Sequence, residues 1–499
     1  MMNKKRIFLT GAGGTMGGAA LKEFIKPEQI QSFDLVILDL PTEKNKKKLL
    51  PIVEKHGIEI IWGDLTQYED VLKGVTGADY VLHAAAFIPP AADHYPDKVM
   101  EINVGAARNI VNAIKAQPEP DNIKLVNVGT VAETGDRTPP IHVGRIGDPI
   151  MPSVFDMYAV SKVEAERIVA ESGLRYWVSL RQTFILTTEA VPNPIMFHSP
   201  LNTCMEACTV ENAGLVLLNV TNPDLPGNFW RNFYNIGDGP ASRFTYEEFM
   251  EKTSKISGFD YKKVYQRNWF STRNFHCQYY EDSWVLNKYL NHQQTGLADY
   301  FKKLKKETSL FQRLLTKWMP KKLLKEKVFV PLASATPDAT QYWIENRNDL
   351  RVSAFFGSRE DHAQIRGWED RVASLDWYNY KRLGHGYDEE KSTKELDLKD
   401  MQKAAKFRGG KCKSIKMEKG DLYQKLNWQC AFNHTFEATP NLVLKGGHWC
   451  PECSPPAWNY DAQAKVSHFI AQAWYAHHQP DENNYYPEDC VYDLQEKTA

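Results

Sequence analysis

A short apolar strand that runs directly into a glycine-rich turn and then into a helix opens this chain. The turn reads Thr10-Gly11-Ala12-Gly13-Gly14-Thr15-Met16-Gly17, with the expected strand Arg6–Leu9 before it and the expected helix Met16–Ile25 after it. Glycine is needed where backbone turns tightly and approaches a pyrophosphate closely, and a helix N-terminus offers free N–H groups and partial positive charge to phosphates. The pattern predicts a dinucleotide-binding turn whose cofactor contacts are Gly11, Gly14, Thr15, Met16 and Gly17.

The first 180 residues alternate short apolar stretches with longer amphipathic ones. Strands that alternate with helices predict an α/β protein with a doubly wound parallel sheet of the Rossmann type. The expected strands are Arg6–Leu9, Leu35–Asp39, Ile58–Trp62, Asp79–His83, Lys124–Val128 and Arg175–Leu180, and the expected helices are Met16–Ile25, Tyr68–Leu72, Lys98–Ala116 and Met157–Ser172.

The identity of the dinucleotide is indicated by the end of the second expected strand, Leu38-Asp39. A carboxylate at this place accepts hydrogen bonds from the ribose hydroxyls of the adenosine, which favours NAD over NADP. Lys44 and Lys46–Lys48 follow closely and could meet a 2′-phosphate. Because a run of lysines is more often a solvated helix face, NAD is the expected cofactor and NADP the alternative.

Tyr158 and Lys162 stand four residues apart at the start of the expected helix Met157–Ser172. Residues at i and i+4 share one face of a helix, so a phenol and an ammonium group could serve one site. A tyrosine ordinarily titrates near about pH 10, and a neighbouring cation lowers its pKa toward the working range. Tyr158 could then exchange a proton with a substrate oxygen, and Thr130, after the strand Lys124–Val128, could polarise the same oxygen.

Residues 5–255 resemble the extended short-chain dehydrogenase/reductases, a family that includes NAD-dependent epimerases and dehydratases. The resemblance is carried by Thr10-Gly11-x-x-Gly14-x-x-Gly17, Asp39, Gly63-Asp64-Leu65, His83-Ala84-Ala85-Ala86, Asn103-Val-Gly, Thr130 and Tyr158-x-x-x-Lys162. It implies a smaller substrate lobe and a catalytic triad of Thr130, Tyr158 and Lys162, the last two also touching the cofactor. It further implies that Asp64 and Leu65 hold the adenine end, that Ala84, Ala85 and Ala86 pass close to the cofactor, and that Asn103 steadies the local backbone.

The chain departs from the family pattern at two places. Gly129 stands where many members have serine, and Leu180-Arg181-Gln182-Thr183 replaces the more usual Arg-Pro pair. The asparagine that sugar-nucleotide members place after this strand is not found, which makes a nucleotide sugar less expected and leaves the substrate open. The expected function is an NAD(P)-dependent oxidoreductase that interconverts a secondary alcohol and a carbonyl. The alternatives are an epimerase or dehydratase with transient oxidation, and a non-catalytic dinucleotide-sensing scaffold.

A cluster of cysteines and histidines in the last hundred residues indicates a metal site. Cys450-Pro-Glu-Cys453 and Cys430-Ala-Phe-Asn-His434 are paired at spacings that let two ligands reach one tetrahedral Zn²⁺. This segment resembles small bacterial zinc-ribbon modules, with Asn433 in place of a glycine. The predicted ligands are Cys430, His434, Cys450 and Cys453, with Cys412 as the alternative fourth ligand. Four protein ligands would make the zinc structural.

Length and composition limit the remaining possibilities. At 499 residues the chain is long enough for several domains, and we predict the segments 1–255, 256–405, 406–456 and 457–499. The 61 basic residues nearly cancel the 62 acidic ones, so nucleic acid is not an expected partner. We expect a small-molecule alcohol or carbonyl substrate, a cytoplasmic location and, by family resemblance, a homodimer through the helices Lys98–Ala116 and Met157–Ser172.

A basic amphipathic stretch in the middle region has two interpretations. Its apolar residues are Phe301, Leu304, Phe311, Leu314, Leu315 and Trp318, near helical spacing. A basic amphipathic helix can lie on a membrane surface. Such a stripe more often packs on its own domain, so membrane contact is the less favoured interpretation.

Overall fold

The computed structural model describes residues 4–189, 191–309, 313, 316–369 and 378–495. Within these residues one sheet has seven strands in the order β11-β7-β5-β4-β1-β2-β3, and every neighbouring pair is parallel. The order reverses between β1 and β4, which is the doubly wound Rossmann arrangement and confirms the predicted fold of the N-terminal region. The strands are β1 (Lys5–Thr10), β2 (Phe33–Asp39), β3 (Glu59–Trp62), β4 (Tyr80–His83), β5 (Lys124–Thr130), β7 (Trp177–Gln182) and β11 (Asn232–Ile236).

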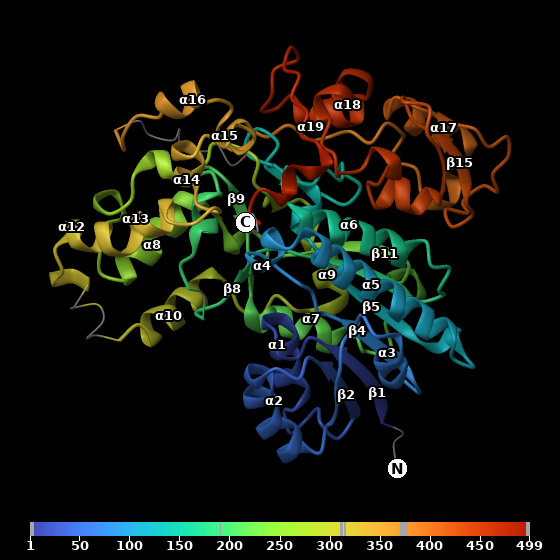
Figure 1. Ribbon diagram of the computed structural model, residues 1–499. Helices are drawn as coiled ribbons and strands as arrows, with labels where there is room; N and C mark the ends of the chain where they lie inside the picture. Colours follow the sequence, from blue (N-terminus) through green and yellow to red (C-terminus); the bar gives the residue numbers. More distant parts are fainter. Residues whose placement is uncertain (1–3, 190, 310–312, 314–315, 370–377, 496–499) are drawn as a thin grey trace.

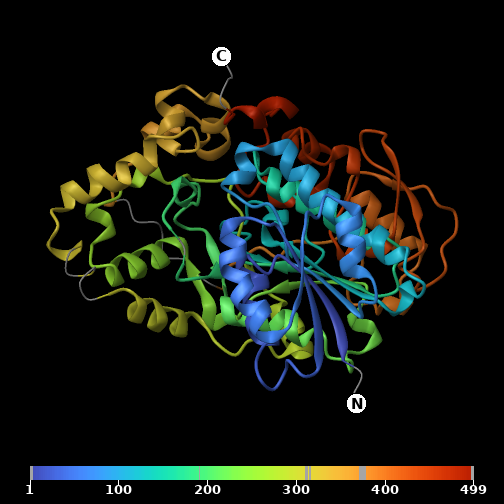
Figure 2. The ribbon, with the colours of Figure 1, turned by 60° about the horizontal axis from the view of Figure 1, so that its bottom comes forward.

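Helices cover both faces of this sheet (Figures 1 and 2). Side chains alternate along a strand, so Phe8 points to one face while Ile7 and Leu9 point to the other. The face with Phe8 is covered by α3 (Tyr68–Val75), α5 (Pro96–Lys115) and α6 (Met157–Ala170), and the other face by α1 (Thr15–Phe24), α2 (Glu43–His56), α7 (Val210–Asn219) and α9 (Ser283–Leu290). All strands and helices predicted for the first 180 residues are present, and α2 is an addition that the sequence analysis did not predict.

A smaller lobe, green to yellow in Figure 1, lies beside the sheet. It contains the pairs β8 (Ile185–Leu186) with β10 (Cys208–Thr209) and β9 (Cys204–Glu206) with β12 (Arg243–Thr245), followed by α8 (Tyr246–Ile256) and α10 (Leu297–Glu307). Its core is aromatic, and the Phe301 ring lies 6.0 Å from that of Phe249.

The predicted amphipathic stripe packs in part on this lobe. Phe301 is buried and Leu304 is partly buried in the lobe's core, whereas Trp318 is 80% exposed. Phe311, Leu314 and Leu315 lie outside the described residues. No helix in the described ranges combines the length and the apolar run needed to span a membrane.

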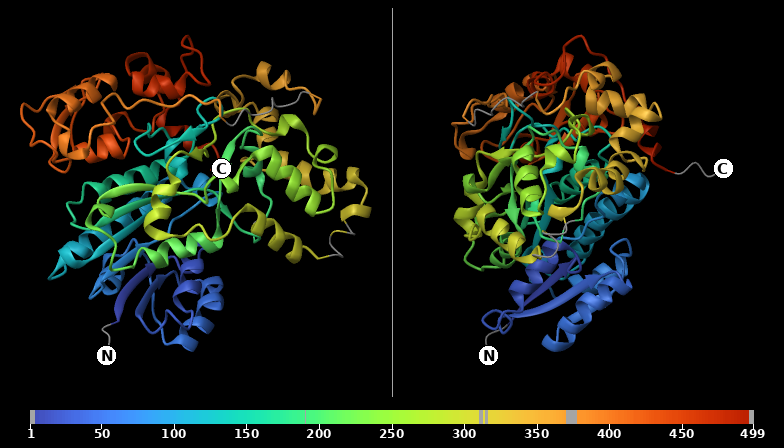
Figure 3. Two further views of the ribbon diagram at one scale, coloured as in Figure 1. Left: turned by 180° about the vertical axis from the view of Figure 1, so that it is seen from behind. Right: turned by 90° about the vertical axis from the view of Figure 1, so that its left-hand side faces the viewer.

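The C-terminal segment packs against α6 (Figures 1 and 3). Its small antiparallel sheet joins β14 (Lys411–Cys412), β15 (Leu426–Gln429) and β16 (Thr435–Ala438), preceded by α17 (Leu398–Phe407). The buried side chains of Trp428 and Leu442 belong to the same hydrophobic cluster as Val169 of α6 and Trp177 of β7. The predicted segment 406–456 therefore shares one core with the seven-stranded sheet.

The last described residues also cover α6. They form α18 (Tyr460–Val466) and α19 (His468–Trp474). The Trp458 indole and the Tyr460 hydroxyl both donate to the Pro152 carbonyl, at 3.1 and 3.0 Å. No residue of α6 is exposed. Of the two helices through which the expected homodimer would form, α6 is thus covered by the chain's own C-terminal segments, whereas α5 keeps exposed residues such as Glu101 and Arg108.

Candidate functional site

The glycine-rich turn joins β1 to α1 at the carboxyl edge of the sheet. Gly11 has φ +75°, and a Cβ there would lie 2.7 Å from the Ala85 Cα. A Cβ on Gly17 would lie 2.3 Å from the Gly11 carbonyl oxygen. Gly14 is the N-cap of α1, whose first turn holds no acidic residue. The turn is therefore closely packed on the protein side and leaves the helix N-terminus available to an anion.

Asp39 ends β2 beside this turn. Its carboxylate accepts hydrogen bonds from the Gly13 N–H at 2.6 Å, the Leu40 N–H at 2.9 Å and the Asn45 side-chain amide at 2.7 Å. Burial raises the pKa of Asp39, and the backbone hydrogen bonds from Gly13 and Leu40 oppose this shift. The Lys48 ammonium donates to the Gly13 carbonyl at 2.8 Å. Asn45 was not predicted, because nothing in its local sequence marks it as a partner of Asp39.

A pocket of about 770 Å³ runs along the carboxyl ends of β1 and β4, where the strand order reverses. Ligands of doubly wound sheets bind at this switch point. Apart from Gly17, which lies beneath the turn, every predicted cofactor and catalytic residue lines the pocket: Gly11, Gly14, Thr15, Met16, Asp39, Asp64, Leu65, Ala84, Ala85, Ala86, Asn103, Thr130, Tyr158 and Lys162. Its walls also include residues that the sequence analysis did not select, namely Phe87, Ile88, Lys98, Gln182, Thr183, Ile185 and Thr187.

Asn103 of α5 connects this wall to the catalytic helix. Its side-chain oxygen accepts from the Phe87 N–H at 2.7 Å, and its amide group donates to the Phe87 carbonyl at 3.1 Å. The same amide donates to the Ser161 hydroxyl at 2.9 Å. One buried side chain therefore holds both the segment after β4 and the helix that carries Tyr158 and Lys162.

Thr130, Tyr158 and Lys162 all line the pocket. Burial raises the pKa of Tyr158, and a hydrogen bond with the Thr130 side chain opposes this shift. Burial also lowers the pKa of Lys162, against the attraction of Glu133 and Glu166. The lowered tyrosine pKa that we expected from the helix spacing is wrong for the chain's own groups, because burial is the largest cause of the shift and Lys162 is not among its causes.

Behind Lys162 lies a buried group of charged residues that the sequence analysis missed. The Arg181 guanidinium lies 3.2 Å from the Glu133 carboxylate and donates to both oxygens of Glu166, at 2.5 and 3.1 Å. Burial, followed by repulsion from Glu166, raises the pKa of Glu133 to about 8. Burial acts in the same direction on Glu166, but the charge of Arg181 outweighs it and holds the pKa of Glu166 well below its usual range. Local spacing could not have indicated this group, because its members come from η2 (Val131–Thr134), α6 and β7.

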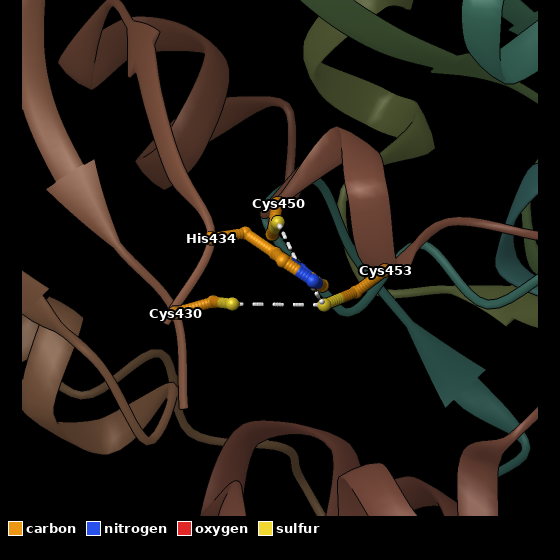
Figure 4. Close-up of side chains that lie close together, drawn as sticks. All are labelled: Cys430, His434, Cys450 and Cys453. Atoms are coloured by element: carbon orange, nitrogen blue, oxygen red, sulfur yellow. Dashed lines mark hydrogen bonds between the residues drawn. The ribbon is translucent and has the colours of Figure 1, made fainter. Parts of the chain in front are cut away.

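Four of the predicted metal ligands converge in the C-terminal segment (Figure 4). The Cys453 sulfur lies 3.7 Å from the Cys430 sulfur and 3.4 Å from the His434 Nδ1, which is 3.7 Å from the Cys450 sulfur. Ligands bound to one tetrahedral Zn²⁺ at about 2.0–2.3 Å would lie about 3.5–3.8 Å from one another. The donor set and its spacing thus fit a zinc ion with four protein ligands.

Cys412, the alternative ligand, lies on β14 and is not part of this group of described residues. Asn433 has φ +67°, a left-handed conformation that asparagine tolerates better than most residues. This backbone conformation explains why asparagine can replace the glycine of similar modules before His434.

The strand order, the switch-point pocket and the glycine-rich turn together define an α/β protein of the Rossmann fold. Residues 7–185 match the family model described as the NAD dependent epimerase/dehydratase family. The UDP-glucose 4-epimerases of Rickettsia akari (strain Hartford) and Rickettsia canadensis (strain McKiel) are 28% and 29% identical over 114 residues, which cover 23% of this chain and 33% of each relative. The chain thus spans about a third of the length of these curated relatives.

Two solved structures are similar to part of this chain. The Bordetella bronchiseptica enzyme WbmG in complex with NAD has 16% sequence identity and a TM-score of 0.48, covering 64% of this chain and 96% of that chain. The Thermus thermophilus UDP-glucose 4-epimerase in complex with NAD has 15% identity and a TM-score of 0.45, covering 61% of this chain and 98% of that chain.

Proposed function

We propose that this protein is an NAD-dependent enzyme that interconverts a secondary alcohol and a carbonyl, with Tyr158 as its acid/base residue. The observation that carries the proposal is the shared pocket: Thr130, Tyr158 and Lys162 line the same 770 Å³ space as the glycine-rich turn. A protein that only sensed a dinucleotide would not need a phenol, an ammonium group and a hydroxyl in the lining of that space.

The residues present fit NAD. Gly11 and Gly17 allow a backbone approach that any Cβ would block, α1 presents its N-terminus, and Asp39 stands where the adenosine ribose is held in such folds. When bound, the nicotinamide would accept a hydride from the carbinol carbon or donate one to it.

The chain's own residues supply the proton transfer. Tyr158 would take the proton of the substrate hydroxyl during oxidation and return it during reduction, while Thr130 would orient the substrate oxygen. Glu133 and Glu166 favour the charged form of Lys162, which would hold the nicotinamide ribose and stabilise the tyrosinate. Because burial raises the pKa of Tyr158, this residue favours its protonated form and needs the positive charge of Lys162 to react.

A second candidate function is an epimerase or dehydratase, in which the substrate is oxidised only transiently. It is favoured by the family match over residues 7–185 and by the UDP-glucose 4-epimerase relatives. The two candidates differ in redox balance, since a dehydrogenase accumulates NADH and an epimerase or dehydratase does not.

The test uses the full chain with NAD⁺ and, separately, UDP-glucose, dTDP-glucose and a panel of secondary alcohols. Absorbance at 340 nm reports net NADH, and NMR of the recovered substrate reports epimerisation or loss of water. Tyr158→Phe should lower turnover by at least about 100-fold, the usual contribution of an acid/base residue. Tyr485→Phe, at an exposed tyrosine of the C-terminal segment, is the matched control and should retain full turnover. Turnover retained by Tyr158→Phe would refute the proposed role.

We also propose a structural zinc ion bound by Cys430, His434, Cys450 and Cys453. The supporting observation is the convergence of four donor atoms that all lie within 4.8 Å of one another. Metal analysis of the purified full chain by mass spectrometry should find one zinc per chain, and a protein purified without bound metal would contradict the assignment.

A further inference from the structure

The loop that precedes the metal knuckle reaches the buried charged group behind the catalytic helix. The Gly446 carbonyl accepts a hydrogen bond from the Arg181 guanidinium at 2.6 Å. His448 Nε2 lies 2.8 Å from the Glu166 carboxylate. These two contacts join the C-terminal segment to residues that stand next to Lys162.

The contacts are fully removed from water. His448 and Arg181 are each 1% exposed, and Glu166 is 0% exposed. A charge at this depth is tolerated only when hydrogen bonds satisfy it, so each donor and acceptor in the group matters. Ionised Glu166 accepts hydrogen bonds only, and His448 therefore acts as a donor from Nε2.

The buried group in turn contacts one of the three proposed catalytic residues, Thr130, and acts electrostatically on another, Lys162. The Glu133 carboxylate accepts a hydrogen bond from the Thr130 N–H at 2.8 Å. Glu166 lies one helical turn after Lys162 on α6, and both carboxylates attract the Lys162 ammonium. The loop, Arg181 and the carboxylates thus form a series of contacts that ends at Thr130, with Glu166 one helical turn from Lys162.

One departure from the family pattern, Gly129, falls within this series, and Arg181 belongs to the segment of the other departure. A Cβ on Gly129 would lie 2.8 Å from the Glu133 carboxylate and 3.3 Å from the Arg181 side chain, so a serine there would displace both. Gly447 has φ +76°, and a Cβ on it would lie 2.0 Å from the Asp148 carbonyl oxygen. Gly129, Arg181 and the Gly446-Gly447-His448 loop therefore fit one another.

We propose that His448, together with the Gly446 carbonyl, is a positioning residue: it holds Glu166 and Arg181 in place and through them orients Lys162 and Thr130 toward the bound dinucleotide. The C-terminal segment is then a working part of the active site. This inference rests on the proposed function.

The test compares four variants of the full chain with the wild type. His448→Leu fills a similar volume without a hydrogen-bond donor, and His448→Gln keeps a donor on a side chain of similar reach. His448→Asn keeps a donor that is too short to reach Glu166. Thr439→Ala breaks a different contact between the same segment and α6, the 2.6 Å hydrogen bond to Glu171, and is the matched control. Each variant is checked for zinc content and circular dichroism, and its NADH affinity is measured by fluorescence titration.

We expect His448→Leu and His448→Asn to weaken NADH binding by fivefold or more, and His448→Gln and Thr439→Ala to stay within twofold of the wild type. If His448→Leu does not fold, His448→Asn decides. Wild-type affinity in the Leu and Asn variants would overturn the inference, as would an equal loss in all four variants, which would show a purely structural role. A wild-type chain that does not bind NADH would instead overturn the proposed function itself.

Discussion

Arg181→Met should be among the most destabilising substitutions in this chain, because it removes the cation that two buried carboxylates share. Glu133 and Glu166 are both 0% exposed. The substitution deletes the guanidinium's contacts with them at 2.5–3.2 Å and its hydrogen bond to Gly446. Removing one partner of a buried ion pair costs about 3–5 kcal/mol, since the remaining charge is left without compensation.

The matched control is Arg382→Met, which also removes an arginine that donates two hydrogen bonds to one carboxylate. Arg382 donates to both oxygens of Glu281 at 2.8 and 2.9 Å, but its side chain is 53% exposed. An exposed pair contributes about 0.2–1 kcal/mol. The two variants should therefore differ by at least about 2 kcal/mol in the free energy of the urea-induced transition that unfolds the sheet.

The pH dependence gives a second check. Without Arg181 the pKa of Glu166 in the folded chain rises above its unfolded value, so the folded state holds a proton that the unfolded state releases. The penalty of Arg181→Met should then grow as the pH rises above about 4.3, the ordinary pKa of a glutamate in an unfolded chain. Equal destabilisation by Arg181→Met and Arg382→Met at every pH would refute the reasoning.

Three further outcomes follow from the described geometry. Gly11→Ala should abolish NADH binding in a fluorescence titration, because its Cβ would lie 2.7 Å from the Ala85 Cα. Gly57→Ala is the control and should retain NADH binding, since Gly57 is also at positive φ but a Cβ there would have nothing within 4 Å. Equal NADH affinities of the two variants would contradict the packing of the turn. Cys453→Ser should lose zinc while Cys412→Ser keeps one equivalent, and metal loss in the Cys412 variant would require a different ligand set. The pKa of Glu133 is raised to about 8, so the free energy of unfolding of the wild type should decline as the pH rises toward that value. Glu133→Gln should remove this decline. Parallel curves of unfolding free energy against pH for the two proteins would disprove the role of Glu133.

The lining of the proposed dinucleotide pocket could be predicted from the sequence because its determinants are local. A strand, a glycine-rich turn and a helix follow one another within about twenty residues, and Tyr158 and Lys162 are related by a single helical turn. The convergence of the four candidate metal ligands could also be predicted, since each pair is formed by a short spacing that one tight loop can close.

The buried charged group could not be predicted in this way. Arg181 and Gly446 are separated by 265 residues, and no periodicity connects them. A signal was present in Gly129, which departs from the family pattern, but the sequence does not show what fills the space that Gly129 leaves. That the C-terminal segments cover α6 could not be predicted either, because this packing depends on contacts between segments that are distant in the sequence.

The shared core of sheet and C-terminal segment has a consequence for biosynthesis. At the usual rate of about 5–20 residues per second, the ribosome adds the 265 residues between Arg181 and Gly446 in roughly 15–50 s. During that interval the nascent sheet lacks the partner that closes its α6 side, and Arg181 lacks one of its acceptors. The amino-terminal half therefore emerges early but reaches its final packing late, and it is exposed to chaperones and proteases for as long as translation of the remainder takes.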